Sequence, residues 1–133
     1  MQLTINAGHQ EIQTSLYSFN QFRIRLAKSL DKEFGDAYKH YLASGDTDEF
    51  FEKAAYCDKL TFELVDFLLA DEKNGEISPS VAEQLLLMLR NIDIDPFMFD
   101  LQEFYDLLEF SAIWKLSIRW KFKKAKILLK REN

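Results

Sequence analysis

The segment KLSIRWKFKKAKILLK, residues 115–130, decides between two fold classes for this chain. In residues 116–122 large apolar side chains alternate with charged or hydroxyl side chains, and this period of two favours a strand. As a helix, the same residues would point to two nearly opposite sides and would need two packing partners. A lone strand has no ladder partner, however, and MQLTIN at residues 1–6 offers only weak alternation as a partner strand.

The rest of the chain has the spacing of amphipathic helices, with apolar residues at steps of three and four. In the third of these segments Phe51, Val65 and Phe67 widen the apolar face, so we expect this helix to be central and buried. Gly75 follows its end, and the next helix has strong start signals at Ser78 and Pro79. The predicted helical segments span about residues 8–31, 31–44, 46–72, 78–91 and 96–111.

These patterns predict an all-α fold, a compact bundle of about five or six helices that forms one helical domain over residues 1–133. Four glycines and two prolines leave few places for the tight turns that many short strands need. Because everything else is helical, the closing segment is also predicted as a helix. The alternative is a short two-stranded pairing of the N- and C-terminal segments.

Charge is divided unevenly along the chain. Residues 1–114 contain nine Lys/Arg and twenty-one Asp/Glu, whereas residues 115–133 contain eight Lys/Arg and one Glu. An acidic body repels nucleic acid and attracts basic surfaces. The sequence therefore predicts a protein that binds a basic protein partner, as an inhibitor or an immunity-type protein does.

Two acidic clusters are the candidate partner-binding residues. One is a stripe at steps of three on the predicted helix 96–111, opposite its apolar face, and the other surrounds the start of the helix at 46–72. Their members are Asp100, Glu103, Asp106 and Glu109 in the first cluster, and Asp46, Asp48, Glu49 and Glu52 in the second.

The basic C-terminal segment 115–131 gives a second hypothesis, nucleic-acid binding. Lysine and arginine would neutralise phosphates, and Trp114, Trp120 and Phe122 would stack on bases. The cations are Lys115, Arg119, Lys121, Lys123, Lys124 and Lys126. Burial of Trp120 and Phe122 would argue instead that the segment completes the core.

No pattern of catalytic or metal-ligating residues appears in the sequence. Cys57 is the only cysteine, so no disulfide can form within the chain, and His9 and His40 lack the ligand spacing of a zinc site. No phosphate-binding glycine loop is present. The first ten residues lack a signal sequence, and no apolar run is long enough to span a membrane. We therefore expect a cytoplasmic, non-enzymatic protein with no cofactor, no metal and no membrane contact.

Overall fold

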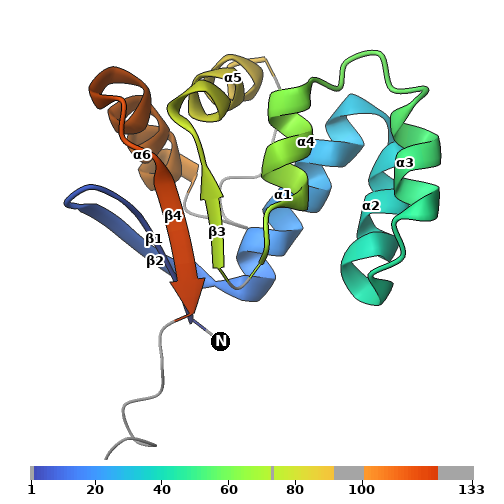
Figure 1. Ribbon diagram of the computed structural model, residues 1–133, viewed down its shortest axis with the longest axis horizontal. Helices are drawn as coiled ribbons and strands as arrows, with labels where there is room; N and C mark the ends of the chain where they lie inside the picture. The colour runs from blue at the N-terminus through green and yellow to red at the C-terminus, as the bar shows by residue number, and fades with distance from the viewer. Residues whose placement is uncertain (1, 73, 92–100, 123–133) are drawn as a thin grey trace, which may run out of the picture.

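The computed structural model describes residues 2–72, 74–91 and 101–122. Within them, six helices accompany a four-stranded sheet (Figure 1). The strands are β1 (Gln2–Ala7), β2 (Gln10–Ser15), β3 (Asn74–Ile77) and β4 (Ile118–Phe122). The helices are α1 (Leu16–Leu30), α2 (Lys32–Ser44), α3 (Asp48–Ala54), α4 (Phe62–Leu69), α5 (Pro79–Leu89) and α6 (Leu101–Trp114). The prediction of an all-α bundle is therefore wrong, and the fold is mixed.

The C-terminal strand β4 has a partner on each side. The strand order is β2-β1-β4-β3, and every pairing is antiparallel. Trp120 lies opposite Ile5 of β1 and opposite Gly75 of β3. The N- and C-terminal segments do pair, as the alternative prediction stated. They do so as β1 and β4 of a four-stranded sheet, not as a two-stranded pair. The prediction failed because it found no adequate ladder partner, whereas β4 has two.

Gly75 shows why β3 was not recognised. The sequence indicated a connection between helices at this point, and four residues carry too little pattern to predict a strand. In the structure, a Cβ on Gly75 would overlap the indole ring of Trp120, so the position requires glycine for close packing. The constraint comes from a residue 45 positions later in the chain, which local patterns do not reveal.

The predicted helix at 8–31 starts later than expected because a hairpin precedes it. Gly8 has a φ of +59° and, with His9, joins β1 to β2 in a two-residue turn, the loop length that favours glycine at its first position. The helix α1 then begins after Ser15, whose hydroxyl accepts a hydrogen bond from the Ser18 amide at 3.0 Å.

One face of the sheet packs against helices. Leu3, Ile5, Ile118 and Trp120 are buried there, while their neighbours along the strands are more exposed. The helices α1, α4 and α6 contact the sheet, whereas α2 and α3 lie at the opposite end of the molecule (Figure 1). Buried side chains from the sheet and the helices form one hydrophobic cluster. No helix in the described parts of the chain is long and apolar enough to cross a bilayer.

The backbone carbonyls at the C-terminal end of α4 accept hydrogen bonds from side chains of other elements. Arg23 of α1 is fully buried and donates from Nη1 to the carbonyl oxygens of Phe67, Leu68 and Ala70, at 3.1, 3.3 and 2.9 Å. Tyr38 of α2 donates to the Leu68 carbonyl at 2.7 Å. The last carbonyls of a helix have no partners within it, so these donors fix α4 to the core.

Tyr38 makes stability sensitive to alkaline pH. Burial raises the pKa of its hydroxyl well above the ordinary value. The unfolded chain ionises this tyrosine near pH 10, whereas the folded chain resists ionisation, so its contribution is complete below about pH 10 and is lost as pH rises. Between about pH 9 and 11, the unfolding free energy of Tyr38→Phe should fall less steeply than that of the wild type, by up to about 1.4 kcal/mol per pH unit.

Urea unfolding at a series of pH values measures this difference. Tyr17→Phe is the matched control, because it removes the hydroxyl of a tyrosine that is 72% exposed. Equal slopes for Tyr38→Phe and the wild type would contradict the assignment.

Candidate protein-binding surface

The acidic stripe on α6 is only partly exposed. Glu103 and Asp106 are exposed and Glu109 is half-buried, while Phe104 and Leu108 on the same helix are buried. Asp106 accepts a hydrogen bond from the side chain of Gln102 at 2.9 Å. Asp100 lies outside the described residues. Two acids of the described part of the stripe are therefore exposed at the surface of α6.

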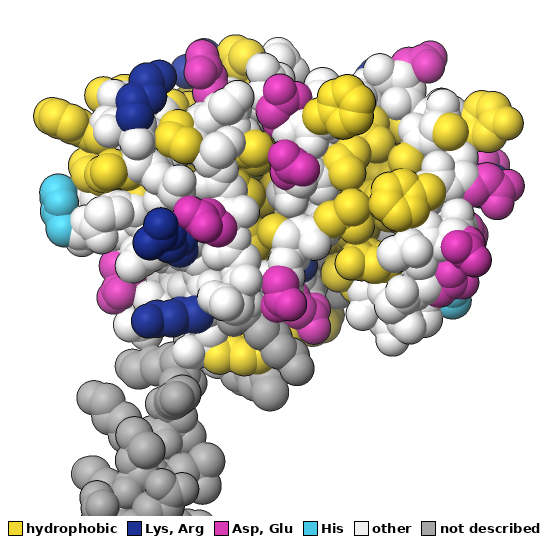
Figure 2. Space-filling view, in the orientation of Figure 1, with side chains coloured by type: hydrophobic (Ala, Val, Ile, Leu, Met, Phe, Trp, Pro, Cys, Tyr) yellow, Lys and Arg dark blue, Asp and Glu magenta, His cyan; other side chains and the backbone are white. Residues whose placement is uncertain are grey.

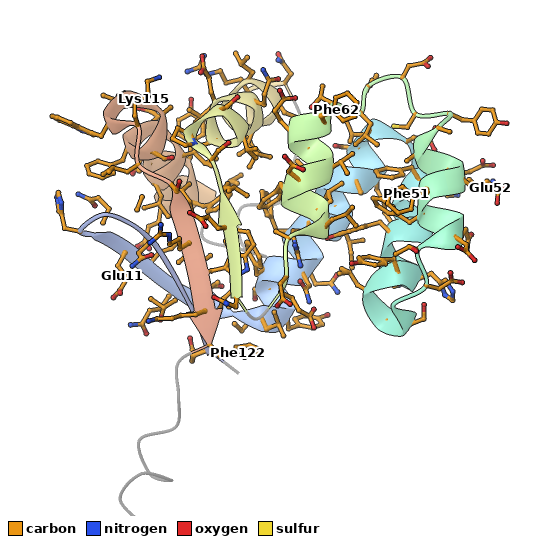
Figure 3. The ribbon with its side chains drawn as sticks, viewed as in Figure 1. Glu11, Phe51, Glu52, Phe62, Lys115 and Phe122 are labelled. Atoms are coloured by element: carbon orange, nitrogen blue, oxygen red, sulfur yellow. The ribbon has the colours of Figure 1, made fainter. Side chains whose placement is uncertain are left out.

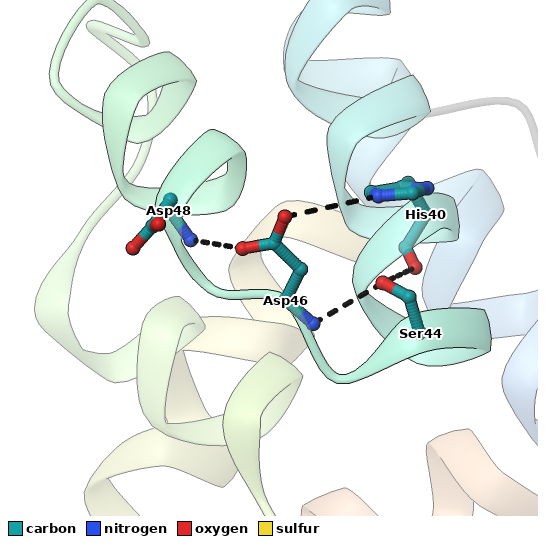
Figure 4. Close-up of polar contacts among 4 residues, drawn as sticks. All are labelled: His40, Ser44, Asp46 and Asp48. Atoms are coloured by element: carbon teal, nitrogen blue, oxygen red, sulfur yellow. Dashed lines mark hydrogen bonds and ion pairs between the residues drawn. The ribbon is translucent and has the colours of Figure 1, made fainter.

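Asp46 stabilises the turn between α2 and α3 (Figure 4). Its Oδ1 accepts a hydrogen bond from the Asp48 amide at 3.0 Å, and its Oδ2 lies 4.0 Å from Nε2 of His40. The Asp46 amide donates to Oγ of Ser44 at 3.1 Å, and that hydroxyl donates to the His40 carbonyl at 2.8 Å. The Asp46 carboxylate therefore serves the local structure, which reduces its availability to a partner.

The remaining acids of this cluster lie on α3. Asp48, Glu49 and Glu52 are exposed, and none of them forms an ion pair with another described residue. Glu52 points outward at the edge of the molecule (Figure 3). Residues 46–72 as a whole contain nine Asp/Glu and two Lys/Arg. This region of the chain is therefore strongly acidic.

Sequence reasoning missed three exposed aromatic side chains in the same region. Phe51 is 52% exposed, Tyr56 81% and Phe62 89%. Phe51 had been placed in the buried face of a single helix at 46–72, and that prediction is wrong. The segment forms two helices, α3 and α4, separated by residues 55–61, so one helical periodicity does not describe it.

Hydrophobic side chains gather over α4 and between α4 and α3, with acidic side chains at the margins (Figure 2). Phe62 lies at the start of α4, and Phe51 projects from α3 toward α4 (Figure 3). We call the exposed aromatic and acidic side chains of residues 48–66 the α3–α4 surface. Its members are Asp48, Glu49, Phe51, Glu52, Tyr56, Asp58, Phe62 and Asp66.

A second exposed apolar cluster lies where α6 ends. Ile113 and Trp114 are 68% and 65% exposed, and Leu116 follows in the turn to β4. The β1–β2 hairpin lies beside it, since the ring of His9 packs edge-on against Phe110 with centroids 5.3 Å apart. Lys115 is the charged residue within this run, so the cluster lacks the acidic character of the α3–α4 surface.

Three basic residues of the nucleic-acid hypothesis lie in the described part of the chain. Lys115 and Lys121 are exposed, and Arg119 pairs with Glu76 at 3.1 Å. Trp120 is 1% exposed and therefore offers no stacking face to a base, and Phe122 is half-buried. Lys123, Lys124 and Lys126 lie outside the described residues. The described part of this segment completes the sheet.

The chemically reactive side chains do not form a cluster. His9 and His40 are exposed on separate elements, and Cys57 is buried between α3 and α4, where burial raises the pKa of its thiol. No group of three or more metal-ligating side chains occurs among the residues that the structure describes. That the protein has no catalytic, metal or cofactor site stays a prediction.

No protein-family model, curated protein or solved structure matches this chain.

Proposed function

We propose that this chain is a non-enzymatic binding protein whose α3–α4 surface contacts a basic protein partner, in the manner of an inhibitor or immunity-type protein. The observation that carries the proposal is the exposure of Tyr56 and Phe62 within a segment dense in carboxylates. Aromatic side chains in the centre of an interface often dominate its binding energy. Carboxylates around them speed association with a cationic protein and disfavour acidic partners.

The acids of α6 have a different part in this proposal. Between Glu103 and Glu109 no aromatic side chain is exposed, because Phe104 is buried and Tyr105 is half-buried. We assign this stripe to long-range attraction of the partner, an effect that salt screens. A cytoplasmic location is part of the same proposal, and the single buried cysteine, which needs no oxidising compartment, supports it.

Tyr56→Ala tests the proposal. The full-length chain, immobilised at low ionic strength, is used to capture a partner from a lysate of the source organism, and the dissociation constant of the identified partner is then measured. Tyr56→Ala should weaken binding by about tenfold or more, because a central aromatic residue is lost. Raising NaCl from about 50 to about 500 mM should weaken wild-type binding as well.

Tyr17→Ala is the matched control, because Tyr17 is a tyrosine of similar exposure on α1, outside the α3–α4 surface. This variant should bind with wild-type affinity. Equal loss in the two variants, or affinity that does not respond to salt, would refute the proposal.

A further inference from the structure

Aromatic and acidic side chains alternate along the α3–α4 surface. Reading from α3 to α4, the exposed members run in the order Asp48, Glu49, Phe51, Glu52, Tyr56, Asp58, Phe62 and Asp66. A partner with a flat basic surface would be complementary in charge to the carboxylates alone. The aromatic rings would then stay exposed to water. The partner must therefore offer apolar or aromatic contacts and cations together.

Few cations within this segment compensate its charge. Lys53 forms an ion pair with Glu33 of α2 at 3.5 Å, which occupies its ammonium group. Lys59 lines a groove with Leu30 and Leu87, between α1, α4 and α5. The nine carboxylates of residues 46–72 outnumber these two lysines, so the segment keeps a net negative charge.

The connection that presents these rings is ordered. The Cys57 amide donates to the Ala54 carbonyl at 3.1 Å, and the Leu60 amide donates to the Cys57 carbonyl at 3.2 Å. Thr61 then caps α4 by accepting from the Leu64 amide at 3.3 Å. Cys57 is buried, so the connection is fixed to the core at its centre. A backbone that is already ordered loses little conformational entropy on binding.

We infer that the α3–α4 surface imitates a single strand of nucleic acid, and that its partner is a basic protein bound through its own nucleic-acid-binding cleft. Such clefts combine lysine and arginine, which neutralise phosphates, with aromatic side chains on which bases stack. Here carboxylates take the place of phosphates, and the rings of Phe51, Tyr56 and Phe62 take the place of bases. This inference rests on the proposed function and adds the class of partner.

Competition at constant ionic strength tests the inference. The complex of the full-length chain with its captured partner is titrated with a dT20 oligonucleotide and, separately, with inorganic polyphosphate of about the same charge. The oligonucleotide should displace the partner at a concentration at least about tenfold lower than polyphosphate, because it supplies stacking bases as well as charge. Displacement of the Phe62→Ala complex should show a smaller difference between the two competitors.

The outcomes separate the two claims. Equal displacement by both polyanions, or displacement by neither, would overturn the imitation of nucleic acid while leaving a basic partner in place. If the partner binds the Tyr56→Ala and Tyr17→Ala variants equally well, the proposed function itself fails, before any competition is measured. Trp114→Ala, which removes an exposed ring outside the surface, should leave both competition curves unchanged.

Discussion

Trp120→Ala is expected to lower the unfolding free energy by about 4 kcal/mol, the cost typical of removing a large buried aromatic side chain. The indole of Trp120 is in edge contact with the rings of Phe19 and Phe67, at centroid distances of 5.1 and 6.2 Å. Its Nε1 donates to the Asp71 carbonyl at 2.8 Å. The substitution leaves a cavity and an unsatisfied acceptor, and urea unfolding followed by circular dichroism measures the loss.

Trp114→Ala is the control, since Trp114 is 65% exposed and should change stability by less than about 0.5 kcal/mol. If Trp120→Ala does not fold, Trp120→Phe preserves most of the ring volume and should cost about 2 kcal/mol. Equal stability of Trp120→Phe and the wild type would show that β4 is not integrated into the core.

Arg23→Met is expected to lower the unfolding free energy by about 3 kcal/mol. A buried charge can sometimes be replaced by an apolar residue without loss, because its own desolvation cost is removed. Here the acceptors are backbone carbonyls of Phe67, Leu68 and Ala70, and the hydrogen bonds to the first two are buried. The hydrogen bonds that these carbonyls lose therefore cost more free energy than removal of the buried charge gains.

Arg25→Met is the matched control, because Arg25 lies on the same helix and is exposed. The Arg25→Met variant should have the same urea unfolding midpoint as the wild type. A stable Arg23→Met variant would mean that the end of α4 does not depend on this guanidinium. The Nε of Arg23 is buried without a hydrogen-bond partner among the described residues, so the arginine is itself imperfectly satisfied.

Local signals predicted the start of α5 correctly, although the start of α1 was placed eight residues too early. Ser78 caps α5 by accepting from the Val81 amide at 3.2 Å, with Pro79 in the first turn, as its position in the sequence indicated. Such signals are local because the bonded groups are three residues apart. The alternation in residues 116–122 was also a correct local indication of a strand, and the error was to overrule it.

Non-local contacts account for what the sequence did not predict. The strand β3 depends on the fit between Gly75 and Trp120, and no pattern near Gly75 reveals that fit. For the α3–α4 surface, charge alone correctly placed Glu49 and Glu52 outside. The exposed Phe62 was missed, because the break between α3 and α4 changes which residues face the core.

Hydrogen–deuterium exchange of the full-length chain, free and bound to its captured partner, tests the binding account most directly. If the α3–α4 surface is the interface, amide protection should rise on binding in residues 48–66 and stay unchanged in residues 113–122. Protection that rises in residues 113–122 and not in residues 48–66 would contradict the account, because it would place the partner on the end of α6 and the strand β4.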